Sequence, residues 1–311
     1  MSGSPSASVI ICTYDEKRLK DLDECINSIL GQRYDNFEIL VVVDHNESLY
    51  RKLVSGYRGL GVKVILNKSA RGQAASMNCG LLNAKGDIVC FIDDDAIAPE
   101  GWIERIQKGG GRRGLHVFGG PAIPIYRPGL KPPPWWDDRV LGRYLAICNR
   151  AIVGCNFVVR RETFELLGEF RPYLGRYGGK LISNEEVEFT LRAYLAGLKV
   201  GFDYGLIVYH KVRPGKLTMP YLLKRAWLQG LSTYLTVRKD LRLALLGREL
   251  MASKCPCEGI REPIKISARM MNTLLIAITF LSYLYCFARY TIIGHPISAT
   301  ASQDAPKSLL R

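Results

Sequence analysis

The chain has 311 residues, 48% of them hydrophobic, and carries 43 Lys and Arg against 29 Asp and Glu, a net charge of +14. This composition suits one large or two small globular domains and excludes an intrinsically disordered chain. The first residues, MSGSPSASVIICTY, show no basic leader and too short an apolar run for a signal peptide, and the nine cysteines include a single C-x-C, at Cys255 and Cys257. We therefore expect reduced thiols in a cytosolic compartment rather than disulfides or a zinc site.

Strands and helices are predicted to alternate at the start of the chain. In chain order, the expected elements are a strand at 7–14, a helix at 19–32, strands at 37–46 and 61–67, a helix at 68–86 and a strand at 87–95. Such alternation indicates a mostly parallel sheet with helices on both faces. In sheets of this kind, ligands bind beyond the carboxyl ends of the strands. Thr13, Asp44 and residues 93–95 fall at those ends, so we expect the functional site there.

Three consecutive aspartates, Asp93, Asp94 and Asp95, follow the fourth apolar run. Like charges repel, and a carboxylate beside a core is costly unless a cation faces it. A hard divalent cation such as Mg²⁺ or Mn²⁺ takes carboxylate oxygens together with substrate phosphates. The cluster therefore predicts a metal that carries a diphosphate. The alternative is a solvated turn with a helix-capping aspartate.

The next part of the chain has a different character. Residues 109–150 are rich in Gly, Pro and Trp and predict an irregular surface loop. A strand followed by a helix is expected at 150–170, and a helix headed by Glu185 and Glu186 is expected at 182–197. Acids in a first helical turn also interact favourably with the helix dipole, so these glutamates have a structural interpretation beside a catalytic one.

Basic residues gather towards the C-terminus, where residues 211–269 hold 13 basic and 4 acidic side chains, a net charge of +9. Apolar residues at helical spacing predict an amphipathic helix over 219–235, packed on the domain or lying in a membrane interface. Residues 270–288 form a 19-residue run without a charge, which is long enough to cross a bilayer core of about 30 Å. The basic residues before this run place the main domain on the cytoplasmic side of a membrane, and membrane contact is favoured over nucleic acid.

Six segments, taken in order, resemble the family 2 glycosyltransferases. They are SVIICTYDE, FEILVVVDHN, RGQAASMNCGLLNAKGDIVCFIDDDAIAPEGW, VGCNFVVRRETFELLGEF, NEEVEF and VYHKV, and the resemblance runs from about Ser8 to about Leu235. PWWDD, LGRYGGKLISNEE and VYHKVRPGKLTMPYLLKRAWLQGLS are similar to archaeal and actinobacterial members that act on lipid-linked glycans. The resemblance implies the α/β GT-A fold of nucleotide-diphospho-sugar transferases, with a mostly parallel mixed sheet, helices on both faces and C-terminal membrane-associated helices.

The resemblance and the composition together divide the chain into four parts. A GT-A catalytic domain is expected over 1–216, with 109–150 as its acceptor-side loop. A basic amphipathic segment at 217–269, a transmembrane or membrane-associated helix at 270–288 and a tail at 289–311 would follow. Whether 270–288 spans a membrane, lies on its surface or is buried in the protein stays open at this point.

Residue by residue, the resemblance implies a donor site and a metal site. Asp44 would accept a hydrogen bond from a uracil-type base, with Thr13 nearby, and His45 stands where the family often has a second acid. The other implied donor contacts are Arg71 for the base or phosphates, Gly72 and Asn78 for close backbone approach, and Asp93 for the ribose or sugar. Asp95 and His210 would hold Mn²⁺ or Mg²⁺, and Asp94 would be structural.

Glu185 and Glu186 match the family's acid pair, in which the second acid is the usual catalytic base. A carboxyl group whose pKa is raised by burial and by an acidic neighbour suits removal of a proton from an acceptor hydroxyl. The resemblance thus implies an inverting, metal-dependent transferase of hexosyl or glucuronosyl type. It would move a sugar from a nucleotide-diphosphate donor, preferably UDP-linked, to a polyprenyl or dolichyl phosphate-linked glycan at the cell membrane. The Q-x-x-R-W element of processive synthases is absent, which indicates one sugar per encounter.

Two other functions are weighed against this one. A sugar nucleotidyltransferase shares the nucleotide-binding layout, but CTYDEKRLK lacks the glycines that such an enzyme needs after its first strand. A non-catalytic, membrane-associated scaffold of the same fold is the second alternative. The presence together of Asp44, Asp93, Asp95, Glu185 and Glu186 counts against it.

Overall fold

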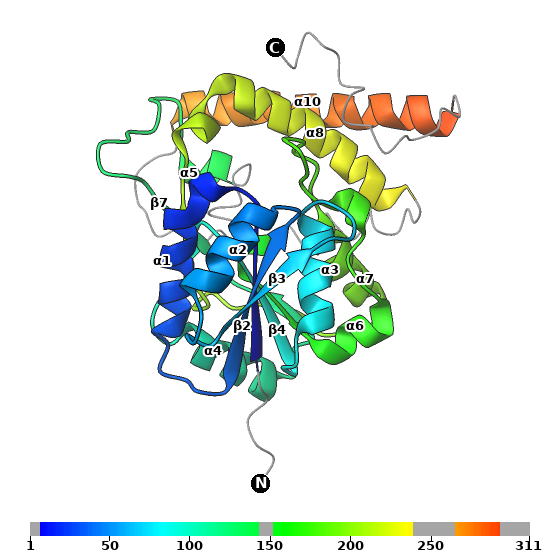
Figure 1. Cartoon of the computed structure of the whole chain (residues 1–311). Coiled ribbons are helices and arrows are strands. Elements are labelled where there is room, and N and C mark those ends of the chain that lie inside the picture. Colours follow the sequence, from blue (N-terminus) through cyan, green and yellow to red (C-terminus); the bar gives the residue numbers. More distant parts are fainter. Residues whose placement is uncertain (1–6, 143–151, 239–264, 293–311) are drawn as a thin grey trace.

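A seven-stranded mixed sheet runs through the centre of the computed structural model, which describes residues 7–142, 152–238 and 265–292 (Figure 1). Its strand order is β3-β2-β1-β4-β8-β6-β9. The strands are β1 (Ala7–Thr13), β2 (Phe37–Asp44), β3 (Val62–Asn67), β4 (Ile88–Asp93), β6 (Val117–Gly119), β8 (Phe157–Arg160) and β9 (Val200–Phe202). β8 is antiparallel to both neighbours, and the other pairs are parallel. The predicted mostly parallel mixed sheet is confirmed.

The strands read as continuous apolar runs because successive side chains enter two different cores. Val9 and Ile11 of β1 pack with one set of helices, whereas Ile10 packs with another set on the opposite face. The first set is α1 (Leu19–Leu30), α2 (Glu47–Gly56) and α4 (Trp102–Arg113), and the second set is α3 (Gln73–Asn83), α6 (Arg161–Leu167) and α7 (Glu185–Leu195). Helices on both faces are therefore confirmed (Figure 1).

The predicted and observed helices agree best where an apolar stripe is complete. In α1, Leu22, Ile26 and Ile29 are fully buried at helical spacing. Sequence analysis missed α2, in which Leu49 and Leu53 are the buried residues, too few to form a recognisable stripe. Short 3₁₀ helices link the main elements: η1 (Glu16–Arg18), η3 (Gly154–Asn156), η4 (Pro172–Leu174) and η5 (Pro214–Leu217).

The irregular loop predicted at 109–150 is confirmed for residues 126–137, which contain only turns and coil, and is wrong for the rest of the described part. That part contains the end of α4, all of β6, the strand β7 (Ala122–Ile125) and the helix α5 (Asp138–Leu141). β6 and β7 have three and four residues, too few for a periodic apolar pattern, and their pairing partners are β8, β9 and the later strand β10 (Val208–Lys211). These strands therefore depend on tertiary pairing. Residues 143–150 of the predicted loop lie outside the described residues.

A second, three-stranded sheet positions one site residue. Its order is β5-β10-β7, where β5 covers Ala96–Ile97. β10 runs antiparallel to β5 with His210 opposite Ala96, and the backbone N–H of Lys211 donates to the carbonyl of Asp95 at 3.0 Å. The small sheet thus fixes His210 beside the aspartates that follow β4.

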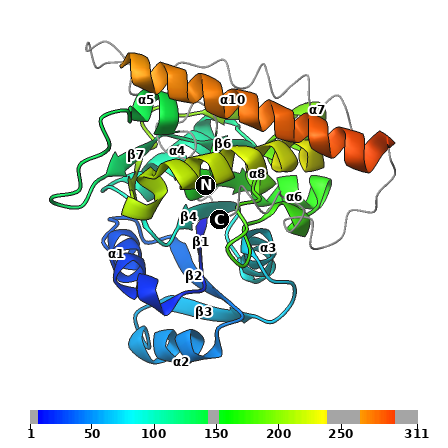
Figure 2. The same cartoon turned by 90° about the horizontal axis from the view of Figure 1, so that it is seen from above.

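Two long helices lie across the carboxyl end of the large sheet (Figures 1 and 2). The helix α8 (Met219–Val237) matches the predicted amphipathic helix, but Arg225, expected off its apolar stripe, is only 7% exposed. The helix α10 (Ile266–Phe287) contains most of the predicted apolar run and is long and apolar enough to cross a membrane by length and composition. Residues 239–264 of the predicted basic segment and 293–311 of the predicted tail lie outside the described residues.

Candidate active site

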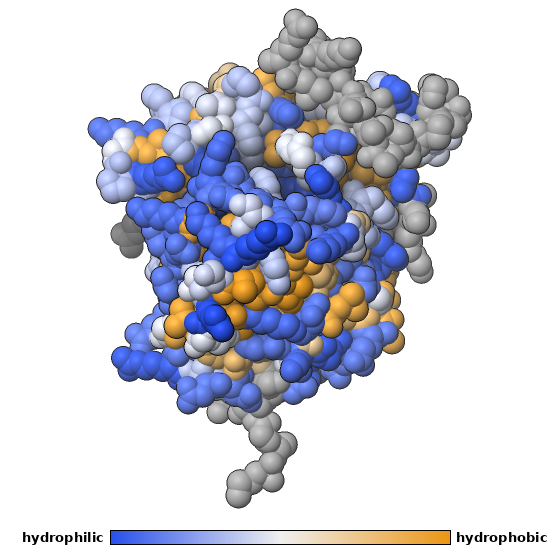
Figure 3. Space-filling view, viewed as in Figure 1, coloured by the Kyte–Doolittle hydropathy of each residue, from blue (hydrophilic) through white to orange (hydrophobic). Residues whose placement is uncertain are grey.

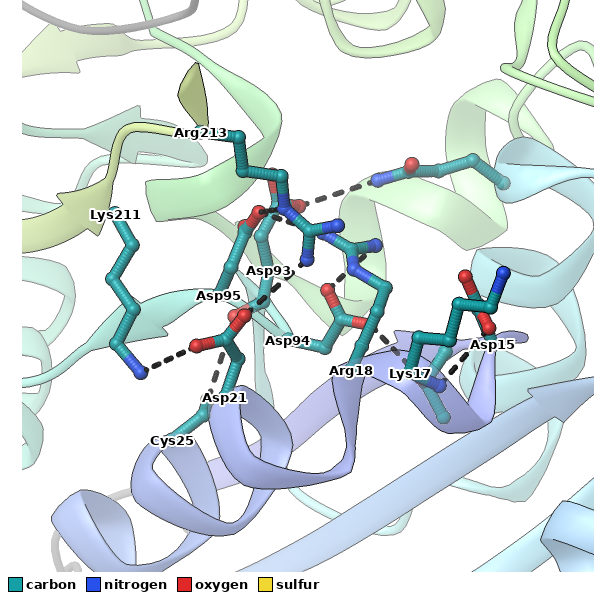
Figure 4. Close-up of polar contacts among 12 residues, drawn as sticks. Asp15, Lys17, Arg18, Asp21, Cys25, Asp93, Asp94, Asp95, Lys211 and Arg213 are labelled. Carbon is teal, nitrogen blue, oxygen red and sulfur yellow. Dashed lines mark hydrogen bonds and ion pairs between the residues drawn. The ribbon is translucent and has the colours of Figure 1, made fainter. Parts of the chain in front are cut away.

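Arg18 faces the aspartates that follow β4. Its guanidinium group bridges two of them, with Nη1 2.8 Å from Asp94 Oδ1 and Nη2 2.6 Å from Asp95 Oδ2 (Figure 4). Both carboxylate side chains are only 2% exposed. Thr13 Oγ1 donates to the second oxygen of Asp94 at 2.8 Å. The positive charge that the aspartates require is therefore supplied, in part, by the chain itself.

The carboxylate of Asp95 has two different sides. Its Oδ2 contacts Arg18 and lies 3.5 Å from Nε of Arg213, whereas its Oδ1 lies 3.3 Å from Nε2 of His210. Burial alone raises the pKa of Asp95, but the surrounding charges of His210, Lys216, Arg18 and Arg213 hold it well below its usual range. Burial raises the pKa of Asp94 to about 7, against the opposing charge of Arg18. Asp95 is thus the more firmly ionised of these two groups.

His210 links the first and third aspartates. Its Nε2 lies 3.5 Å from Asp93 Oδ2 as well as 3.3 Å from Asp95 Oδ1, and the ring is 3% exposed. The other oxygen of Asp93 accepts from Nε2 of Gln73 at 3.3 Å. These contacts hold Asp93, Asp95 and His210 around one small region at the carboxyl edge of the sheet.

The donors in this region fit a hard divalent cation. Neighbouring ligands around Mg²⁺ lie roughly 3 Å apart when each metal–oxygen distance is about 2.1 Å, close to the separation between His210 and Asp95. Arg18 and Arg213 contact Oδ2 of Asp95 and leave Oδ1 turned towards His210. The sulfur of Cys155 also lies within 4.8 Å of donor atoms of Asp93 and His210, but burial raises the pKa of its thiol well above the ordinary value. Oxygen and nitrogen are therefore the donors that suit Mn²⁺ or Mg²⁺ here.

Glu185 and Glu186 form a second acidic group with a different environment. They begin α7, after Asn184, whose φ of 90° turns the chain sharply into the helix. Glu186 Oε1 accepts from the backbone N–H of Gly154 at 3.4 Å, and within the described structure Oε2 of each glutamate is buried without a hydrogen-bond partner. Burial raises the pKa of both carboxyl groups, that of Glu185 further because of Glu186, against the opposing charge of Arg176. Each carboxyl group of this pair therefore holds a proton more strongly than an exposed glutamate does.

The 3₁₀ helix η3 connects the two acidic groups. Gly154, at its start, donates to Glu186, and the next residue, Cys155, lies beside Asp93 and His210. The aspartate cluster and the glutamate pair therefore border the same region. The structure brings together the five sequence-predicted residues Asp93, Asp95, Glu185, Glu186 and His210.

The predicted donor-binding residues fall into two places. Asp44, Arg71 and Gly72 lie together at the ends of β2 and β3, where Asp44 Oδ2 accepts from the N–H of Gly72 at 2.9 Å and Oδ1 accepts from Asn67 at 3.0 Å. Gly72 has a φ of 111°, which only glycine adopts readily. The next residue, Gln73, bonds Asp93, so this corner adjoins the aspartates.

Thr13 and Asn78 have internal partners. Thr13 is 2% exposed and donates to Asp94. Asn78 donates to the carbonyl of Phe170 at 2.9 Å and accepts from its N–H at 3.0 Å, which fixes α3 to the loop that precedes η4. Contact of either residue with a nucleotide stays a prediction.

Three arginines of the site were missed by sequence analysis: Arg18, Arg176 and Arg225. Arg18 follows β1 by five residues, so its place at the same sheet edge as the aspartates was a usable signal. Arg225 offered no signal, because a basic residue on an amphipathic helix normally faces solvent. Its Nη2 donates to Ser183 Oγ at 3.0 Å, and burial, with the nearby Arg176, lowers its pKa to about 10.

Several known proteins are similar to this chain in sequence. The family model for glycosyl transferase family 2 matches residues 8–166. The glucosyl-dolichyl phosphate glucuronosyltransferase of Haloferax volcanii is 28% identical over 236 residues, which cover 72% of this chain and 75% of that protein. The glycosyltransferase AglE of the same organism is 27% identical over 218 residues, 68% of each protein.

Solved structures show the same fold at low sequence identity. The mannosyltransferase PcManGT from Pyrobaculum calidifontis, in complex with GDP-Man and Mn²⁺, has a TM-score of 0.56 at 18% identity, and the match covers 99% of this chain and 81% of that one. S. aureus TarS 1–349 has a TM-score of 0.54 at 16% identity, covering 93% and 73%. Because the family model matches slightly more than half of the sequence and these neighbours share its architecture, the chain belongs to glycosyl transferase family 2 and has the GT-A fold.

Proposed function

We propose that this chain is an inverting, metal-dependent glycosyltransferase that transfers a sugar from a nucleotide diphosphate to a hydroxyl group of a lipid-phosphate-linked glycan. One observation carries the proposal. An ionised acidic group with cationic partners and a buried, proton-holding acidic pair border the same region, joined by η3. The first would hold a divalent cation that meets the charged diphosphate of a donor, and the second suits a general base.

Glu186 is the proposed base. It would take the proton from the acceptor hydroxyl, whose oxygen then attacks the anomeric carbon as the bond to the diphosphate breaks. Attack from the face opposite the leaving group inverts the configuration of that carbon. The Gly154 N–H orients Glu186, and burial raises the pKa of Glu186 above its ordinary value, which suits proton transfer.

Asp93, Asp95 and His210 are the residues that would hold Mn²⁺ or Mg²⁺. A bound divalent cation neutralises charge that develops on the departing diphosphate. PcManGT was solved with Mn²⁺, which supports the same requirement here. Arg213, whose side chain is 35% exposed beside Asp95, is placed to meet a phosphate oxygen as well.

The proposed identity of the donor and of the acceptor is based on related proteins. Neighbouring TarS structures contain UDP and UDP-GlcNAc, whereas PcManGT contains GDP-Man. Asp44, at the end of β2, would contact the base, and we favour a UDP-linked donor of hexosyl or glucuronosyl type. The named activity of the first Haloferax relative supports a dolichyl or polyprenyl phosphate-linked acceptor. The enzyme would then work at a membrane, with its catalytic domain on the cytoplasmic side, and the proposal requires no nucleic acid.

Replacing the proposed base should stop transfer without removing donor binding. Glu186→Gln is expected to lower the turnover number about 10²–10⁴-fold, the usual contribution of a general base. Turnover would be followed as nucleotide release in the presence of acceptor, and nucleotide binding by calorimetry. Glu188→Gln is the matched control on the same helix, because Glu188 pairs with Arg192 at 2.9 Å outside the site. A folded Glu186→Gln protein with near-normal turnover would show that another residue is the base.

The raised pKa of Glu185 predicts a pH-dependent stability change. A carboxyl group whose pKa is higher in the folded than in the unfolded protein stabilises the fold at low pH. This stabilisation is fully present below the unfolded pKa and is lost as pH rises through the folded pKa. Gln cannot lose a proton, so the thermal midpoint of Glu185→Gln should rise relative to wild type as pH increases above 4.5, the ordinary pKa of a glutamate. Scanning calorimetry across this range tests the sign. A constant difference at all pH values would mean that Glu185 is not a buried carboxyl of raised pKa.

Arg18 should oppose cation binding at Asp95. Arg18→Gln removes a positive charge beside a metal ligand, and unit charges about 4 Å apart interact by about 1–4 kcal/mol between water and a protein surface. The affinity for Mn²⁺, measured by electron paramagnetic resonance titration, should therefore rise by about fivefold or more. Arg33→Gln is the control, since Arg33 is 86% exposed and pairs with Glu100. Unchanged or weaker Mn²⁺ binding by folded Arg18→Gln would place the cation away from Asp95.

A further inference from the structure

The helix α10 exposes large apolar residues on the side that faces away from the protein. Its packed side holds Ala268, Leu275, Thr279, Ser282 and Cys286, together with the partly buried Met271, Ile278 and Tyr283. The opposite side is apolar and large, with exposed fractions of 77% for Ile266, 69% for Met270, 59% for Phe280 and 58% for Leu281, and lower values for Leu274 and Leu284. A contiguous apolar helix face of this kind marks a site of interaction.

α10 is held tightly along α8. Thr279 Oγ1 donates to the carbonyl of Ala226 at 3.0 Å, and Ser282 Oγ donates to the carbonyl of Trp227 at 2.7 Å. Gly230 lies at the contact, where a Cβ atom would fall 2.6 Å from Cβ of Ser282 and overlap the carbonyl oxygen of Thr279. The two helices therefore approach as closely as a glycine permits. α10 cannot rotate its packed side away from α8 without breaking these bonds.

α8, in turn, is part of the catalytic domain. Gln229 Nε2 donates to Asn184 Oδ1 at 2.9 Å, and Arg225 donates to Ser183. Ser232 Oγ accepts from the backbone N–H of Ser183 at 3.1 Å. These bonds hold the turn that presents the glutamate pair, so α8 cannot leave the domain while the site is assembled.

This arrangement decides the orientation of α10 in a membrane. A spanning helix is surrounded by lipid and has its ends on opposite sides of the bilayer. α10 lies across the carboxyl end of the sheet along α8, and upright insertion would drag Lys224, Arg225 and Gln229 of α8 into hydrocarbon (Figures 1 and 2). Insertion in the plane of the surface requires no such movement.

Charge selects the kind of surface. Lys265 and Arg269 are exposed at the start of α10, next to the apolar face, and the chain has a net charge of +14. These charges attract anionic headgroups, whereas a second copy of the chain would bring like charges together. In the space-filling view some hydrophobic side chains show at the upper edge near α10, and larger hydrophobic areas lie in the middle and lower part of this face (Figure 3).

We propose that α10 lies parallel to an anionic bilayer surface, with its large apolar side in the acyl boundary and both of its ends on the same side of the membrane. This deepens the proposed function, because it names the surface at which a lipid-linked acceptor would reach the glutamate pair. α8 contacts both α10 and the turn before Glu185, so the membrane lies next to the end of the sheet that carries the site.

Vesicle flotation of the full chain, without sugar donor, tests the surface. Wild type should float with vesicles of mixed phosphatidylglycerol and phosphatidylcholine, and less with phosphatidylcholine alone. Phe280→Asp combined with Leu284→Asp should weaken binding at least about tenfold, since two apolar side chains are lost from the acyl boundary and two negative charges are added. Leu82→Asp, at a position on α3 that is 74% exposed, is the matched control and should float like wild type.

The side of the membrane on which the C-terminus lies tests the proposed in-plane orientation of α10. An epitope added after Arg311 should be digested by protease together with the catalytic domain in inside-out membrane vesicles, and should be protected in intact spheroplasts. An epitope on the opposite side from the catalytic domain would overturn the in-plane orientation. Vesicle binding that the double substitution leaves unchanged, or self-association in place of vesicle binding, would overturn the proposed surface. Neither readout depends on catalysis, so failure of the proposed function would be recognised separately.

Discussion

Arg18 places one guanidinium group between the carboxylates of Asp94 and Asp95, at the point where a strand buried on both faces ends in three acids. Without a cation, these acids would repel one another at the edge of the core. Removing one partner from a buried ion pair typically costs about 3–5 kcal/mol, because it leaves an uncompensated charge. This pairing occupies Oδ2 of Asp95, whereas Oδ1 faces His210. Arg18 therefore compensates the charge of the acids and competes for the carboxylate that a cation would bind.

The two acidic groups of the site differ because their surroundings differ. Asp95 has arginine, histidine and lysine around it and stays ionised, whereas the glutamate pair is buried with little compensation and holds protons more strongly. One protein region thus contains carboxyl groups suited to charge stabilisation and carboxyl groups suited to proton transfer. The 3₁₀ helix η3 lies between the two groups, and α8 supports the second group through Ser183 and Asn184.

Parts of the fold and of the site were predictable from the sequence where a local run of residues alone determines the structure. Buried strands are continuous apolar runs, so the sheet and its carboxyl edge followed from the sequence, and with them the neighbourhood of Asp44 and the aspartates. β6 and β7 were not predictable, because their three or four residues are strands only through distant partners. Arg18 and Arg225 were missed because a buried arginine is recognisable only once its acidic or polar partners are in place. The orientation of α10 needed its contact with α8, since a 19-residue apolar run fits a spanning or an in-plane helix equally well.

Nucleotide release from purified protein tests the central claim most directly. A panel of UDP- and GDP-linked sugars would be incubated with Mn²⁺ and with chelator, and nucleotide binding measured alongside. The account predicts release from one donor that requires the metal, or metal-dependent binding of that donor with release only when a lipid-linked acceptor is added. Absence of both metal-dependent release and metal-dependent binding across the panel would contradict it, and would identify the chain as a scaffold that keeps the fold without the chemistry.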